Sequence, residues 1–233
     1  MKTERILEMI NNNEIKELKK ILQDEIYTSK INANPGQKKR YAAMKKFYKY
    51  VTQKNPALLS PCKDIEVNTR MLSGKYNCFC DSYSVVLTTE GIGEIEAYDT
   101  EKGKYFDIEK FLCDNVNDLH ISKINFNSVL AKAKSLGYKL IKSEVENSRS
   151  RNTEVKYLLK YKPFEDKKPA YFKIGLLDKA FSIIDDGKSC EVYYIDNISP
   201  LFIKSSIGLC FVLPINADEN IEEHKTIIEA MEI

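Results

Sequence analysis

Residues 170–215 read AYFKIGLLDKAFSIIDDGKSCEVYYIDNISPLFIKSSIGLCFVLPI, and this stretch decides the fold. Apolar residues recur at helical spacing over Leu176–Ile184, and the polar run Asp185-Asp186-Gly187 predicts a turn after the helix. Strands are predicted on both sides of the helix, at Tyr171–Ile174, Cys190–Ile195, Pro200–Lys204 and Leu209–Leu213. Because connections this short cannot make parallel crossovers, the sheet is expected to be antiparallel.

The segment upstream shows the same order of strand, helix and further strands. Strands are predicted at Ile65–Met71, Tyr76–Cys80, Tyr83–Thr89, Glu94–Asp99, Leu119–Ile124, Lys139–Val145 and Glu154–Tyr161, and helices at Glu109–Cys113 and Asn127–Leu136. The expected fold class is α+β, an antiparallel sheet with helices on one face. One shared core is expected to comprise Phe172, Leu176, Leu177, Phe181, Val192, Phe202, Phe211 and Leu213.

The two ends of the chain have a different character. Lys2–Ile26 and Gln37–Gln53 have helical periods, and the acidic end, Ala217 to Ile233, carries six acidic side chains against Lys225 alone. Spaced isoleucines in the acidic end predict a helix or tail that packs back on its own domain, either over the apolar surface by Leu213 to Ile215 or against the basic face of Lys38 to Lys49. A frayed, solvated end is the remaining alternative. Four parts are therefore expected: a helical segment (1–55), a strand-rich middle (56–117), a sheet domain (118–216) and the acidic end (217–233).

Composition excludes several classes of protein. The 233 residues are 43% hydrophobic, which is enough for a core, and 36 basic against 34 acidic side chains give a net charge of +2. The longest nearly uninterrupted apolar run, Ile207–Ile215, is shorter than the roughly 20 residues that span a bilayer. Because the N-terminus lacks the apolar core of a secretion signal, we expect a cytoplasmic protein with no membrane partner.

Catalytic chemistry is scarce in this sequence. Gly91-Ile92-Gly93 lacks the third glycine of a dinucleotide fingerprint, and the two histidines, His120 and His224, have no cysteine at metal-ligand spacing. Asp64, Asp81, Asp99 and Asp107 stand in or beside predicted strand ends, where carboxylates converge on a metal in some hydrolases and are more commonly solvated or cap helices. We therefore expect neither a cofactor nor an enzyme.

Residues 26–63 carry nine basic side chains and no acidic one, and the helix expected over Gln37–Gln53 holds most of them. Its candidate nucleic-acid-binding residues are Lys38, Lys39, Arg40, Lys45, Lys46 and Lys49. Clustered cations attract phosphate in a salt-dependent, sequence-independent way, while Tyr41, Met44, Tyr48 and Val51 on another side suit docking. Two other interpretations remain, a solvated lysine-rich face and a site for a protein or membrane partner.

Four short pieces resemble the bacterial sliding clamp, the beta subunit of DNA polymerase III, and shorter clamp-like proteins of phages and mobile elements. They are Cys80–Leu87, where the family has Thr-Asp-Gly-aromatic-Arg-Leu, then Phe172–Phe181, Ile198–Ile203 and Leu209–Ile215. The last three follow one another in the family's order, with its Leu-Ser-Pro strand and apolar-Pro-apolar finish. Ser82 replaces the family's glycine and Ser84 its arginine.

The resemblance implies a clamp-like domain over 118–216, an incomplete one over 56–117, and a role in DNA replication or processivity. Its implied partners are DNA and a short peptide of a replication protein, the latter bound near Leu213, Pro214 and Ile215. A chain of this length has room for two such domains at most, so a monomer or dimer is expected rather than a closed ring. A regulatory or protein-interaction module that keeps the fold without binding DNA is the alternative.

Overall fold

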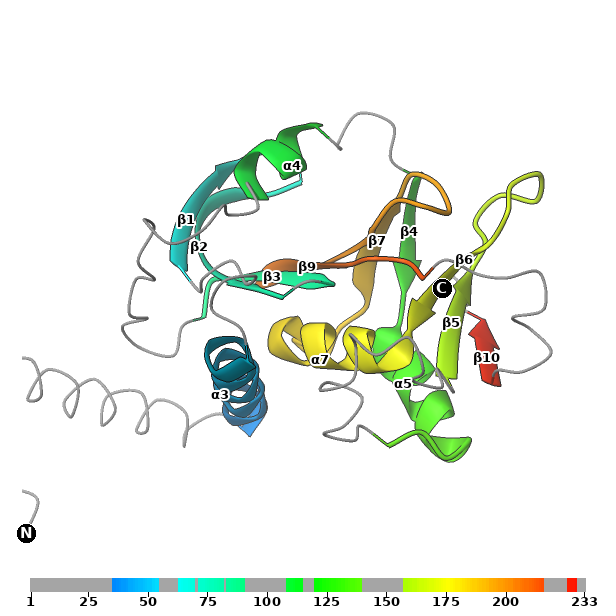
Figure 1. Cartoon of the computed structure of the whole chain (residues 1–233), viewed down its shortest axis with the longest axis horizontal. Helices are drawn as coiled ribbons and strands as arrows, with labels where there is room; N and C mark the ends of the chain where they lie inside the picture. The colour runs from blue at the N-terminus through cyan, green and yellow to red at the C-terminus, as the bar shows by residue number, and fades with distance from the viewer. Residues whose placement is uncertain are drawn as a thin grey trace, which may run out of the picture.

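The computed structural model describes residues 35–54, 63–69, 71–81, 83–90, 108–114, 120–139, 157–215 and 226–229, and in the helix over 35–54 the side chains are described as far as Phe47 (Figure 1). The helix expected over Lys2–Ile26 and the strand over Glu94–Asp99 lie outside the described residues. So does the strand expected over Lys139–Val145, apart from Lys139. No described helix is both long and apolar enough to cross a membrane.

The secondary structure follows the sequence pattern closely. The helices are α3 (Pro35–Lys54), α4 (Ile108–Asp114), α5 (Phe126–Ser135) and α7 (Ile174–Ile184). The strands are β1 (Lys63–Asn68), β2 (Ser73–Cys80), β3 (Ser84–Thr88), β4 (His120–Ile124), β5 (Tyr157–Tyr161), β6 (Ala170–Lys173), β7 (Cys190–Tyr194), β8 (Leu201–Ser205), β9 (Gly208–Val212) and β10 (Thr226–Glu229). The α+β class is therefore confirmed.

Two sheets organise these elements. The larger sheet has seven strands in the order β1-β2-β3-β9-β8-β7-β4, and each neighbouring pair in it is antiparallel. The smaller sheet has the order β10-β5-β6. Because β3 pairs with β9, the strand-rich middle and the segment 118–216 contribute to one continuous sheet.

Helix α7 is the centre of the main core. It is apolar around most of its circumference, and its buried side chains include Leu177, Ala180 and Phe181. Figure 1 shows α3, α5 and α7 on the same side of the larger sheet, where their apolar side chains share one cluster with Val86 of β3 and Ile203 of β8. The burial of their apolar side chains against one face of the sheet thus holds all three helices in place.

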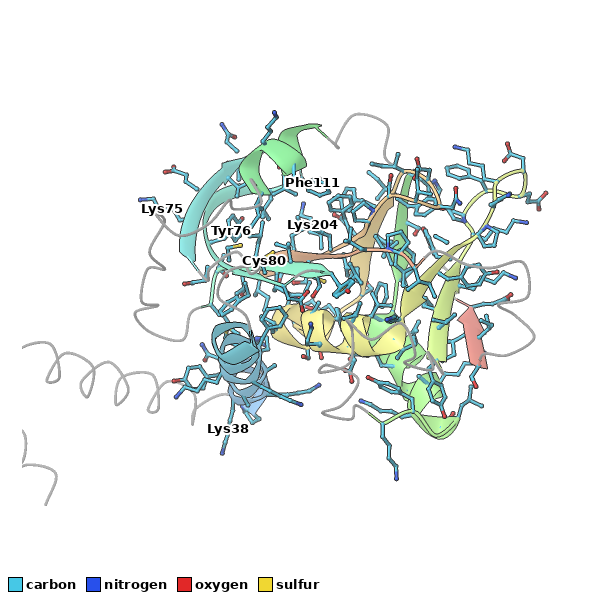
Figure 2. The ribbon with its side chains drawn as sticks, in the orientation of Figure 1. Lys38, Lys75, Tyr76, Cys80, Phe111 and Lys204 are labelled. Atoms are coloured by element: carbon cyan, nitrogen blue, oxygen red, sulfur yellow. The ribbon has the colours of Figure 1, made fainter. Side chains whose placement is uncertain are left out.

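The opposite face of the larger sheet is also buried, which corrects the expectation of helices on one face. Phe111 of α4, labelled in Figure 2, packs there. Its ring centroid lies 6.2 Å from that of Phe202 and 5.1 Å from that of Phe211. Side chains alternate across a strand, so Phe202 and Phe211 point away from the face that Val192 and α7 share. The expectation of one shared core was wrong for these two phenylalanines, and Leu213 is 37% exposed.

The acidic end contains a strand where a helix was expected. Thr226–Glu229 forms β10, which pairs in parallel with β5 and buries Ile228. β-branched residues fill most of this short segment, and an open strand edge supplies backbone partners that favour extension over a helix. β10 lies on the far side of β5 from β6, whereas Ile215 donates its N–H to Tyr171 of β6. The described part of the acidic end therefore does not cover Leu213–Ile215.

Gly208 occupies the tightest backbone approach in the larger sheet. A Cβ at this position would overlap the backbone oxygen of Leu87 and lie 3.0 Å from Thr88 Cα and from Ile184 Cγ2. Backbone atoms of a central strand cannot retreat as a flexible side chain can. A residue larger than glycine therefore does not fit at position 208, where β9 pairs with Thr88 of β3.

We expect Gly208→Ala to lower the free energy of unfolding by about 3 kcal/mol, at the upper end of ordinary overpacking penalties. Chemical denaturation measures this loss. Gly187→Ala is the matched control, because its Cβ would meet nothing within 4 Å and it faces only the strain of φ +81°, which costs about 1 to 2 kcal/mol. Equal losses in the two variants would contradict the close approach of β9 to β3.

Candidate nucleic-acid interface

Helix α3 has a buried stripe and an exposed stripe. Arg40, Met44 and Phe47 are buried, at spacings of four and three residues, and Phe47 packs edge-on against Phe79 of β2. Lys38, Lys39, Lys45 and Lys46 are exposed. As the sequence predicted, one face of α3 packs on the protein and another face exposes lysines. The buried face also includes Arg40 and Phe47, which the prediction had not placed there.

Arg40 belongs to the core side, which corrects its assignment to nucleic-acid binding. Its Nε and Nη2 donate to the two carboxylate oxygens of Glu90, at 2.8 and 2.6 Å, and its Nη1 donates to the backbone oxygen of Asp185 at 3.1 Å. The hydrogen bond to Glu90 raises the pKa of Arg40 despite partial burial. Because Arg40 is buried and all three of its nitrogen atoms donate inside the protein, it is not a candidate for phosphate binding.

Lys39 has a divided role. Its Nζ lies 3.3 Å from Asp185 Oδ2, while 67% of its side chain stays exposed. Burial alone would raise the pKa of Asp185, but hydrogen bonds from Asn127, Gly187 and Lys39 outweigh burial and hold that pKa below its ordinary value. Asp185 is therefore an ionised partner of Lys39, and the charge of Lys39 is partly neutralised at this site.

Lys38, Lys45 and Lys46 are the other lysines of α3 with described side chains, and all three are exposed. Lys45 lies over the ring of Tyr41, with 4.6 Å from Nζ to the ring centroid. Lys38 and Lys46 are exposed and have no carboxylate partner among the described residues. Lys49 lies in α3, but its side chain is outside the described part of the structure.

Helix α5 adds two cations on the same side of the sheet. Asn125 caps its N-terminus by accepting from Ser128 N–H, and Gly137 follows its C-terminus with φ +95°. Lys132 and Lys134 stand in the last turn of α5 and are exposed. Cations at this end also complement the helix dipole. The candidate basic surface therefore comprises exposed lysines of α3 and α5, two helices that both contact α7.

Lys179 of α7 is not part of that surface. Its Nζ pairs with Asp81 Oδ2, and the two side chains are 9% and 3% exposed. The ammonium group also lies 4.8 Å from the ring centroid of Phe47 of α3. The other carboxylate oxygen of Asp81 accepts from the N–H groups of Tyr83 and Ser84, at 2.8 and 2.7 Å. One buried ion pair thus joins the β2–β3 turn, α7 and α3.

Of the four aspartates considered as metal ligands, the structure describes the side chain of Asp81. Asp81 is committed to Lys179 and to its own turn, the side chain of Asp64 is outside the described residues, and so are Asp99 and Asp107. Among the described residues, no group of three or more His, Cys, Asp or Glu side chains is arranged to hold a metal ion.

The segment Leu213–Ile215 bridges the two sheets. Leu213 N–H donates to the backbone oxygen of Tyr83, and Ile215 N–H donates to that of Tyr171, both at 2.9 Å. Leu213 is exposed, while Pro214 and Ile215 are half-buried. The segment expected to bind a peptide is therefore held at both ends, and Leu213 is its most exposed apolar side chain.

The comparisons with known proteins add no assignment: no family model, curated protein or solved structure matches this chain. The interpretation of the site therefore depends on its geometry. The sequence prediction missed Glu90 and Asp185, the partners of Arg40 and Lys39. The one available signal was the pair Asp185-Asp186 directly after a helix, where negative charge is unfavourable unless cations lie nearby.

The Asp81–Lys179 pair gives a test of the docked arrangement. Asp81→Ala and Lys179→Ala should each destabilise the protein by about 3 to 5 kcal/mol, because each leaves a buried charge without its partner. The double variant should cost clearly less than the sum, with an interaction energy of about 1 to 3 kcal/mol in chemical denaturation. Additive losses would mean that the two charges do not interact.

Proposed function

We propose that this protein is a non-enzymatic, DNA-associated, clamp-like binding module that serves DNA replication or processivity, of the short type found in phages or mobile elements. The observation that carries the proposal is the presence of exposed lysines on both α3 and α5, two helices that lie on one side of the antiparallel sheet (Figure 1). Helices on a rigid sheet present cations at fixed positions, and fixed cations suit a regular phosphate backbone.

The clamp-like part of the proposal is supported by the connectivity. β6 leads directly into α7, and β7, β8 and β9 follow as consecutive antiparallel strands. β4 leads into α5 in the same way, with Asn125 alone between strand and helix. This order matches the strand, helix and meander for which the sequence resembles a sliding clamp. The turn at Asp81, which stands where the family has its Thr-Asp-Gly motif, contacts α7 through Lys179.

The strength of the proposed contact follows from the cations that face solvent. Lys38, Lys45 and Lys46 of α3 and Lys132 and Lys134 of α5 are exposed. Arg40 is buried, and Lys39 lies beside the carboxylate of Asp185. With about one phosphate for each exposed lysine, log K for duplex DNA should fall with log salt at a slope of about −4.5. Fluorescence anisotropy with a labelled 20-base-pair duplex, between 50 and 300 mM NaCl, measures the slope.

A charge-reversal variant tests the location of the site. Changing Lys38, Lys45 and Lys46 together to Glu should abolish detectable duplex binding without lowering the melting temperature, because these side chains are exposed. The matched control reverses Lys75, Lys162 and Lys168, which are exposed on β2 and on the β5–β6 connection (Figure 2 labels Lys38 and Lys75). Equal losses in the two triple variants would assign binding to net charge and refute the α3 site.

A protein-interaction module without DNA binding is the second candidate, and exposed Leu213 favours it. The backbone of Leu213–Ile215 is fixed by Tyr83 and Tyr171, so a partner would meet a preorganised apolar edge. Absence of salt-dependent duplex binding, together with a replication-protein peptide whose binding Leu213→Asp abolishes, would favour this candidate. Light scattering then separates a monomer or dimer from a ring.

A further inference from the structure

The residue that follows α7, Asp185, contacts both lysine-bearing helices. Its Oδ2 accepts from Lys39 of α3 at 3.3 Å, and its Oδ1 accepts from Asn127 Nδ2 of α5 at 3.0 Å. Its backbone oxygen accepts from Arg40 of α3 at 3.1 Å. Gly187 N–H also donates to Oδ1 at 3.0 Å, which closes the turn after α7. One side chain therefore ties α3, α5 and α7 together.

These contacts fix the side chain of Asp185 from several directions. It is 11% exposed, so the carboxylate is largely withdrawn from water. Lys39 and Arg40 bring two cations to the C-terminal end of α7, where carbonyl groups carry negative partial charge, and this arrangement is favourable. Asn127 stands near the N-terminus of α5, where a negative side chain is favourable for the same reason. One largely buried carboxylate therefore contacts side chains of both α3 and α5.

We infer that Asp185 is a positioning residue, which holds the lysines of α3 and the lysines of α5 in one register so that a single duplex contacts both. The inference rests on the proposed DNA-binding function. In this role Asp185 does not touch the nucleic acid. It acts through Lys39 and Asn127, and its negative charge by itself opposes a polyanion.

The neighbouring aspartate supplies a matched control. Asp186 accepts from Ser206 N–H and Oγ, at 3.2 and 2.6 Å, and from Lys188 N–H at 3.0 Å. Its described hydrogen bonds therefore anchor the β8–β9 turn and involve neither α3 nor α5. Asp185→Ala and Asp186→Ala remove the same charge from the same turn, and only the first removes the carboxylate that joins Lys39 of α3 to Asn127 of α5.

A purely electrostatic role and a positioning role of Asp185 predict opposite changes in duplex affinity and in salt slope for Asp185→Ala. Removal of a carboxylate beside a basic surface should strengthen duplex binding, and release of Lys39 should make the salt slope steeper by up to about 0.9. Loss of register should instead remove about one phosphate contact, so that the slope becomes shallower by about 0.9 and the affinity falls about tenfold at 0.1 M salt. A merely structural loss of stability at fixed register would not change the slope.

The experiment measures the salt dependence of binding to the 20-base-pair duplex for the wild type, Asp185→Ala, Asp186→Ala and Asn127→Ala. We expect Asp185→Ala and Asn127→Ala to bind more weakly with a shallower slope, and Asp186→Ala to bind as tightly as the wild type or slightly more tightly. Asn127→Ala changes no charge, so its agreement with Asp185→Ala would identify the link itself as the cause. Binding by Asp185→Ala that equals or exceeds that of Asp186→Ala would overturn the inference.

Amide hydrogen exchange on the same variants separates this inference from the proposed function. We expect faster exchange in the first turns of α3 in Asp185→Ala than in Asp186→Ala, whether or not DNA is bound. A wild type that binds no duplex refutes the proposed function, and unchanged exchange in Asp185→Ala refutes the positioning role of Asp185. The two measurements can therefore refute the proposed function and the role of Asp185 independently of each other.

Discussion

The buried ion pair between Asp81 and Lys179 is the interaction on which the arrangement of the helices depends. Asp81 holds the β2–β3 turn through backbone N–H groups, and Lys179 brings the middle of α7 to that turn. Phe47 of α3 covers the ammonium group. Neither charge can be left alone in this environment, because a buried charge without its partner is strongly unfavourable. The pair therefore fixes the position of α7 and α3 relative to β3, the central partner of β9.

A sheet with two buried faces explains why the candidate interface lies on helices. Phe202 and Phe211 are covered by α4, and the opposite face is covered by α3, α5 and α7. Little sheet surface is then left in its centre to contact a large partner, and the exposed lysines of the proposed interface lie on the covering helices. Because the core holds these helices rigidly, their cations would lose little conformational entropy on association with a partner.

The cations of α3 divide into an inner and an outer group. Arg40 and Lys39, the inner group, neutralise Glu90 and Asp185 and so hold the helix on the core. Lys38, Lys45 and Lys46, the outer group, face solvent. The nine basic residues of 26–63 therefore overstate the charge that a polyanion would meet. The cations that help to hold α3 on the core are therefore not the residues proposed to bind nucleic acid.

The sequence by itself determined the α+β class, the antiparallel order of β7, β8 and β9, and the bounds of α5 and α7 to within a few residues, because these depend on local periods and short connections. Tertiary structure decided the rest. Phe202 and Phe211 had no local signal for the second core, and Thr226–Glu229 became a strand because β5 offered an edge. Arg40 and Lys38 stand two positions apart with similar charge, but Arg40 meets Glu90 and Asp185, which are 50 and 145 residues away. Contacts between segments so distant in the sequence leave no periodicity, so only the folded chain separates the buried cation from the exposed one.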